Sequence, residues 1–159
     1  MRISSLTLVY HAACFDGAAS AAIFSAFARE RLGVGQLVLA RDDYGAGPLD
    51  ARQLGPHSAV VDFKFSADPR VRFWADHHHA GGALDTADAL AAYEARRDDP
   101  RLIFDPGAPS CAGLLTRELR ARFGWASGRY DELACECDLI DAAGYETLSE
   151  ALDLENAPA

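Results

Sequence analysis

An aspartate followed by consecutive histidines, Asp76, His77 and His78, comes directly after the apolar stretch 71–75, which has β character. Carboxylate oxygens and neutral imidazole nitrogens are ligands of divalent ions such as manganese, magnesium and zinc. A bound ion is often the largest local charge in its site, so it can hold a phosphate group even in an acidic protein. The three residues therefore indicate a metal site and, with it, metal-assisted phosphate chemistry.

Two further stretches place the same residue types at the ends of apolar runs. His11 and Asp16 follow the run 6–10, and Asp62 ends the run 58–62. If the strands are parallel, their carboxyl ends meet at one edge of the sheet, where ligands bind in open α/β sheets. One carboxylate there can bridge two ions, and a pair of ions can activate a water and stabilise a phosphoryl group under attack. We expect Asp62 to be that bridge.

Short apolar runs alternate with helical segments along the chain. Strands are expected at 6–10, 36–40, 58–62, 71–75 and 102–104, and helices at 18–31, at about 84–97 and from Ser110 onward. The alternation favours an α/β fold, a three-layer domain with a largely parallel central sheet flanked by helices. No internal repeat, low-complexity segment or linker interrupts the chain, so residues 1–159 are expected to form a single domain.

The charge balance limits the class of ligand. With 24 acidic and 15 basic side chains among 159 residues, the formal net charge is -9, which argues against a broad basic surface for long duplex nucleic acid. The four cysteines have neither zinc-ribbon spacing nor a disulfide-dense pattern. No stretch resembles a signal peptide or a membrane span. We expect a cytoplasmic protein with free thiols, a small phosphorylated substrate and no membrane partner.

His11 with Asp16, the isolated Asp62 and the run 76–78 together resemble, in their order and rough spacing, the first three motifs of the DHH phosphoesterase superfamily. The third motif is the most specific of them. The resemblance covers essentially the whole chain, as the N-terminal catalytic domain of such proteins.

The resemblance implies a reaction. Members of the family are phosphohydrolases that use two divalent ions, usually Mn²⁺, with Mg²⁺ or another divalent ion as alternatives. Metal-activated water cleaves a phosphodiester or a phosphoanhydride in their substrates. This chain is thus expected to be a Mn-dependent phosphoesterase that acts on a small phosphorylated substrate, such as a short oligonucleotide or a phosphonucleotide.

The resemblance also assigns roles to single residues. One ion would be bound by His11, Asp16 and Asp62, and the other by Asp62, His77 and Asp138. The last of these is the best match to a fourth family motif, and Asp141 is the competing choice. His78 would face the substrate phosphate, while Asp76 would orient the neighbouring imidazole or join the metal shell.

Two departures from the family pattern bear on this interpretation. Many members carry a further aspartate close to Asp16, whereas this chain has Cys14 before it and Ala18 after it, so a softer or weaker second metal site is expected. Members also usually continue into a C-terminal substrate-binding domain. This domain is expected to be absent from this chain, which would then be a fragment of a longer protein or a reduced form. The alternative function is a non-catalytic metal- or nucleotide-binding module, or an inactive fragment of a longer DHH protein. The sequence indicates no oligomeric state.

Overall fold

Parallel strands form the central sheet of the computed structural model, which describes residues 4–43, 48–126 and 128–153. Every pair of neighbours in this sheet is parallel, in the order β2-β1-β3-β4-β5. The strands are β1 (Ser5–His11), β2 (Gln36–Asp42), β3 (Ser58–Val61), β4 (Val71–Asp76) and β5 (Leu102–Phe104). The expected strand positions are thereby confirmed to within two residues at each end.

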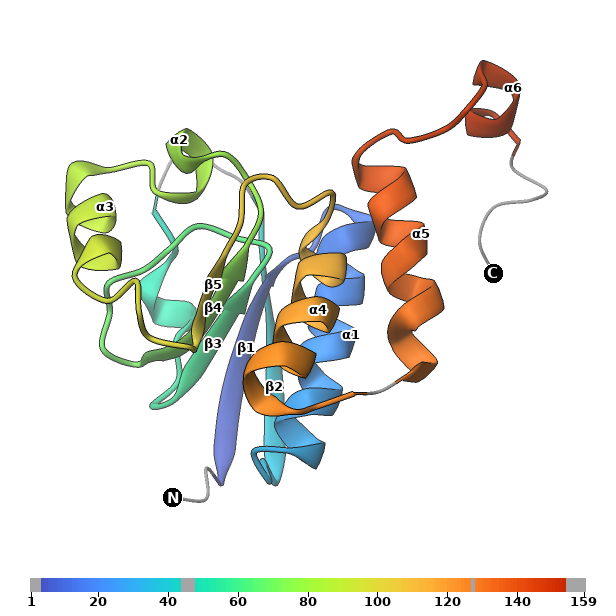
Figure 1. The fold of residues 1–159 in the computed structure, drawn as a ribbon. Helices are drawn as coiled ribbons and strands as arrows, with labels where there is room; N and C mark the ends of the chain where they lie inside the picture. The colour runs from blue at the N-terminus through green and yellow to red at the C-terminus, as the bar shows by residue number, and fades with distance from the viewer. Residues whose placement is uncertain (1–3, 44–47, 127, 154–159) are drawn as a thin grey trace.

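Helices cover both faces of the sheet, so the predicted three-layer α/β architecture is confirmed (Figure 1). One face carries α1 (Phe15–Glu30) and α4 (Cys111–Phe123), and α5 (Asp131–Asp141) packs against these two helices. The other face carries η1 (Ala51–Gln53), α2 (Ala80–Ala83) and α3 (Ala87–Glu94). The short η2 (Gly128–Tyr130) and α6 (Leu148–Ala151) complete the described elements. Within the described residues, no helix is both long enough and apolar enough to cross a lipid bilayer.

The strands are buried on both faces because each face packs on a separate apolar cluster. In β4, Phe73 packs on the α1 and α4 side, whereas Trp74 packs on the α3 side. The indole N–H of Trp74 donates a 2.8 Å hydrogen bond to the carbonyl oxygen of Phe63. Complete burial of an apolar side chain of this kind contributes about 1.5–3 kcal/mol. The two clusters therefore fix the sheet, and with it the positions of the strand ends.

Two helices differ from the predicted ranges. The expected helix over 84–97 is wrong in its extent: Thr86 accepts a hydrogen bond from the backbone N–H of Ala89 and starts α3 afresh after the short α2. Helix α1 begins three residues before the expected 18–31 because Cys14 caps it, its sulfur accepting the N–H of Gly17 at 3.2 Å. The predicted start of α4 is confirmed, with Ser110 as its N-cap.

The first turn of α1 lies very close to the ends of β1 and β3. A Cβ atom added to Gly17 would collide with the carbonyl oxygen of His11 and lie 3.0 Å from Oδ2 of Asp62. Only glycine at position 17 allows α1 to approach the two strands this closely. The approach brings residues of β1, α1 and the end of β3 together.

The Gly17→Ala variant is therefore expected to unfold more easily than the parent protein. Forcing a methyl group into a packed site costs about 1–3 kcal/mol, which chemical denaturation measures directly. Gly82→Ala is the matched control, because its added Cβ would meet its nearest atom, in His79, at an ordinary 3.6 Å. Equal stability of the two variants would contradict the close approach at Gly17.

Candidate metal centre

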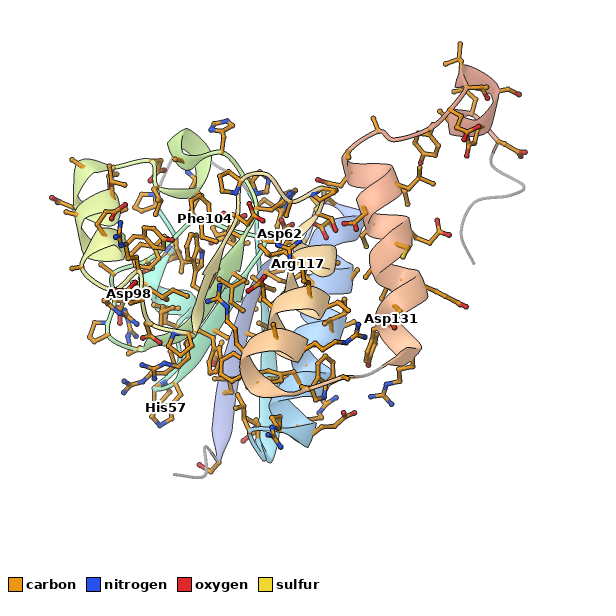
Figure 2. All side chains as sticks on the ribbon, in the orientation of Figure 1. His57, Asp62, Asp98, Phe104, Arg117 and Asp131 are labelled. Atoms are coloured by element: carbon orange, nitrogen blue, oxygen red, sulfur yellow. The ribbon has the colours of Figure 1, made fainter. Side chains whose placement is uncertain are left out.

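The candidate centre lies at the carboxyl ends of the strands, around β1 and β3. In the order β2-β1-β3-β4-β5, the strand following β1 in the chain lies on one side of it, and β3 and the later strands lie on the other. Ligands of open α/β sheets bind outside the carboxyl ends at such a switch point. Figure 2 shows Asp62 at this edge, whereas His57, which directly precedes β3, lies at the opposite edge.

Asp62 is at the middle of the centre. Its side chain is 1 % exposed, and its backbone has a φ of 53°, the left-handed region that few residues other than glycine adopt. Oδ2 lies 3.3 Å from Sγ of Cys14 and 3.6 Å from Nδ1 of His11. Oδ1 lies 3.7 Å from Nε2 of His77 and is buried without a hydrogen-bond partner. The two oxygens therefore face two different groups of ligating atoms, as a bridging carboxylate must.

The first group, called here the thiol cluster, consists of His11, Cys14 and Asp62. In addition to the contacts of Asp62, Sγ of Cys14 lies 3.1 Å from Nδ1 of His11. These are the last residue of β1, the N-cap of α1 and the residue after β3. All three atoms are close enough to contact one ion.

The second group, called here the carboxylate cluster, consists of Asp16, His77 and Asp141. Nε2 of His77 lies 3.4 Å from Oδ2 of Asp16 and 3.3 Å from Oδ2 of Asp141. A further group of Asp62, His77 and His78 overlaps it and joins the two clusters.

The ring of His77 is oriented by a hydrogen bond on the side away from the carboxylates. Its Nδ1 lies 3.1 Å from the carbonyl oxygen of Ala108, and since a carbonyl only accepts, this nitrogen carries the proton. Nε2 therefore points at the carboxylates, and it is buried with no hydrogen-bond partner. Metal-ligating histidines almost always donate their other N–H to a carbonyl or a carboxylate in this way. The donor set fits a divalent ion.

Asp16 is fixed by the N-terminus of α4. Its carboxylate accepts the backbone N–H groups of Cys111 at 2.7 Å and of Ala112 at 2.8 Å, where the helix dipole favours negative charge. Burial nevertheless raises the pKa of Asp16, against the effect of these hydrogen bonds. The buried carboxylate thus has a defined position in the metal-free protein.

Asp76 orients His78. Oδ1 of Asp76 accepts a 2.7 Å hydrogen bond from Nδ1 of His78, and this bond is the main reason that the pKa of His78 is raised. The same oxygen accepts the backbone N–H groups of His77 and His78. The side chain of Asp76 is fully buried, whereas that of His78 is 34 % exposed. The arrangement corresponds to the first of the two roles expected for Asp76.

The two aspartates of α5 occupy different surroundings. Asp138 accepts a 2.6 Å hydrogen bond from the hydroxyl of Ser110 and belongs to none of the three groups found among the described residues. Asp141, at the last turn of the helix, lies beside His77 instead. The structure therefore brings the competing choice, Asp141, into the centre.

The grouping of ligands also differs from the expected one in two respects. Asp16 lies beside His77 rather than beside His11. The backbone N–H of Cys111, at the start of α4, donates a hydrogen bond to the carboxylate of Asp16 and holds it on the α4 side. Cys14, which led to the expectation of a softer or weaker second metal site, was not among the expected ligands, yet it places its sulfur beside His11 and Asp62. The sequence does contain Cys14 next to the first motif, but nothing in its spacing shows that the thiol faces inward.

Like charges crowd the centre. Burial, followed by the negative charges of Asp16 and Asp76, raises the pKa of Asp62 to about 8. Burial also raises the pKa of the Cys14 thiol to about 12 and, together with the charge of His78, lowers the pKa of His11. Metal binding requires deprotonated ligands and releases protons from such groups. A divalent cation is thus the natural counter-charge for this set.

A scan against models of protein families gave no match, and searches of curated proteins and of solved structures gave none either. The functional inference therefore depends on the residues of the centre and on the motif resemblance.

The contribution of Asp62 to the stability of the metal-free protein is expected to fall as the pH rises. Between the ordinary pKa of 3.8 and the native value of about 8, the native state keeps a proton on Asp62 that the unfolded state has lost. Asp62 therefore lowers the free energy of unfolding progressively from about pH 4 to pH 8, whereas His11, whose pKa is lowered, acts with the opposite sign. Denaturation with a chelator present, repeated across this range, measures the slope.

Asp62→Asn is expected to flatten this profile and to raise the stability at pH 8 by about 0.5–2 kcal/mol. Asparagine tolerates the left-handed backbone, whereas alanine would be strained there. Added Mn²⁺ should stabilise the parent protein more than the variant, which loses the carboxylate that faces both clusters. Asp131→Asn, an exposed residue paired with Arg120, is the control, and an equal pH slope in both variants would contradict the assignment to Asp62.

Proposed function

We propose that this chain is a metal-dependent phosphohydrolase domain of the DHH type that acts on a small phosphorylated substrate. The observation that carries the proposal is Nε2 of His77, a buried nitrogen within 3.3–3.7 Å of oxygens from Asp16, Asp62 and Asp141. It makes a hydrogen bond with none of them. A cation among these atoms satisfies the nitrogen and the carboxylates together.

The position of Asp62 favours two ions rather than one. Its Oδ2 belongs to the thiol cluster, and its Oδ1 faces the carboxylate cluster. His11, Cys14 and Asp62 would hold one ion, and Asp16, His77 and Asp141 the other. When bound, two such ions, with Mn²⁺ as the first choice, activate a water and stabilise the charge of a phosphoryl group under attack.

His78 is the residue best placed to meet the substrate. Asp76 accepts a hydrogen bond from its Nδ1, and this bond raises the pKa of His78, which favours the protonated ring. The ring is partly exposed beside the buried ligands. A protonated imidazole there would donate a hydrogen bond to a phosphate oxygen and would orient the phosphate against the metal centre.

The size of the substrate follows from the charge of the protein. A net charge of -9 repels a long polyanion, so the positive charge that meets the substrate would come from the bound ions and His78. A phosphonucleotide or a short oligonucleotide needs no more than this local charge. The free cysteines of the described chain agree with a reducing compartment, and we propose the cytoplasm.

A non-catalytic metal- or nucleotide-binding module is the second candidate. Where many family members have a second aspartate, this chain has the thiol of Cys14. Sulfur suits other ions than oxygen does, so the thiol could leave a site that binds metal without the ion pair needed for hydrolysis. Binding of ions without turnover of any substrate would support the module over the enzyme.

The first test is hydrolysis of a panel of short oligoribonucleotides, a 3′,5′-bisphosphorylated nucleotide, a cyclic dinucleotide and polyphosphate, with Mn²⁺ titrated in. Turnover should need the metal and should fall about 100-fold or more in Asp62→Asn, because loss even of a ligand's supporting partner costs 10- to 100-fold. Asp131→Asn should retain it. Metal-independent turnover, or full activity of Asp62→Asn, would contradict the proposal.

The second test compares the two aspartates of α5. Asp141→Asn is expected to weaken Mn²⁺ binding by about tenfold or more, because it removes a charged ligand. Asp138→Asn keeps an oxygen for the hydroxyl of Ser110 and should bind Mn²⁺ nearly as the parent does. Calorimetric titration measures both, and a larger loss in Asp138→Asn would reverse the assignment.

A further inference from the structure

The thiol cluster has the dimensions of a site for a single four-coordinate ion. Its three ligating atoms, in His11, Cys14 and Asp62, are separated by 3.1, 3.3 and 3.6 Å. Zinc bonds of about 2.0–2.3 Å at tetrahedral angles place neighbouring ligand atoms about 3.4–3.6 Å apart. Movements of a few tenths of an ångström would therefore complete the coordination.

Capping of α1 does not account for sulfur at position 14. Serine, threonine, aspartate and asparagine are the preferred N-cap residues, and any of them could accept the N–H of Gly17 that Cys14 accepts at 3.2 Å. The sulfur also faces His11 and Asp62 at the same time. The N–H of Gly17 favours a thiolate at this N-terminus, but burial outweighs it in the metal-free protein, so a bound cation is needed to hold the sulfur as a thiolate.

The carboxylate cluster has a different chemistry. Asp16 and Asp141 supply oxygen, His77 supplies nitrogen, and Oδ1 of Asp62 lies on the same side. Oxygen-rich sites suit manganese and magnesium, whereas thiolate suits zinc and similar borderline ions. The thiol cluster and the carboxylate cluster, which both face Asp62, would therefore favour different ions.

We propose that the centre is a mixed-metal site, in which Cys14 is a thiolate ligand of Zn²⁺ in the thiol cluster and Mn²⁺ occupies the carboxylate cluster. On binding, the thiol proton, which Cys14 donates to Asp62 in the metal-free protein, and any proton carried by Asp62 itself leave to solvent while the S–Zn and O–Zn bonds form. The inference rests on the proposed function only in its requirement that ions bind here. It adds the identity of the ions to that proposal.

Cobalt is the probe, because thiolate bound to Co²⁺ absorbs strongly in the near ultraviolet and oxygen or nitrogen ligands do not. Titration of the metal-free protein with Co²⁺ should give this band, saturating at one ion per chain while binding continues to two. Cys14→Ser should lose the band, and Cys135→Ser, which alters an exposed thiol, should keep it. Serine is a preferred N-cap residue, so Cys14→Ser is expected to fold. Comparison of its circular dichroism spectrum with that of the parent protein checks this.

Competition provides an independent measurement. Zn²⁺ binds most nitrogen and oxygen sites more tightly than Mn²⁺ does, so the metal-free protein is given one equivalent of Zn²⁺ and a large excess of Mn²⁺. Elemental analysis should then find one of each ion per chain. In Cys14→Asp, which also keeps the cap, the affinity for Zn²⁺ should fall about 100-fold, and less zinc and more manganese should be bound under the same conditions.

The outcomes separate this inference from the proposed function. Two bound Co²⁺ ions without the sulfur band, or a band that survives in Cys14→Ser, would overturn the thiolate ligand and leave the two-ion phosphohydrolase standing. The band without turnover of any substrate would uphold the thiolate ligand and count against the enzyme. Failure of Co²⁺ to bind would overturn both.

Discussion

The burial of several carboxylates and imidazoles at one edge of a parallel sheet is the constraint on which the rest of this structure depends. Asp62 is central to it, because its two oxygens face separate sets of ligating atoms and its left-handed backbone is a strained conformation. Such strain and repulsion are stored at functional sites and compensated elsewhere in a fold. Here the compensation comes from two apolar clusters that hold the strands rigid.

Three of the candidate ligands, Cys14, Asp16 and His77, are held by backbone groups. The carbonyl oxygen of Ala108 sets the ring of His77, and the N-terminus of α4 holds Asp16. The first turn of α1 lies against the end of β1 because residue 17 has no side chain. Backbone donors and acceptors move little, so the centre is organised before any ion arrives. Preorganisation of this kind would serve the proposed metal chemistry at a phosphate.

The sequence predicted the strand ends well, because alternating apolar runs define the strands and parallel strands bring their carboxyl ends to one edge. It could not decide between Asp138 and Asp141, since that depends on the rotation and tilt of α5 against α4. It could not show that Asp16 joins His77, because the hydrogen bonds responsible come from backbone N–H groups of Cys111 and Ala112. The expected helix over 84–97 overlooked the cap at Thr86, a local choice that helical spacing does not reveal.

The measurement that tests the central claim most directly is anomalous X-ray scattering from crystals saturated with Co²⁺, an ion that accepts both sulfur and oxygen ligands. The account predicts two peaks at the carboxyl edge of the sheet. One should contact His11, Cys14 and Asp62, the other should contact Asp16, His77 and Asp141, and both should touch Asp62. Peaks elsewhere, or carboxylates that pair through protons with no ion between them, would contradict a metal centre at this edge.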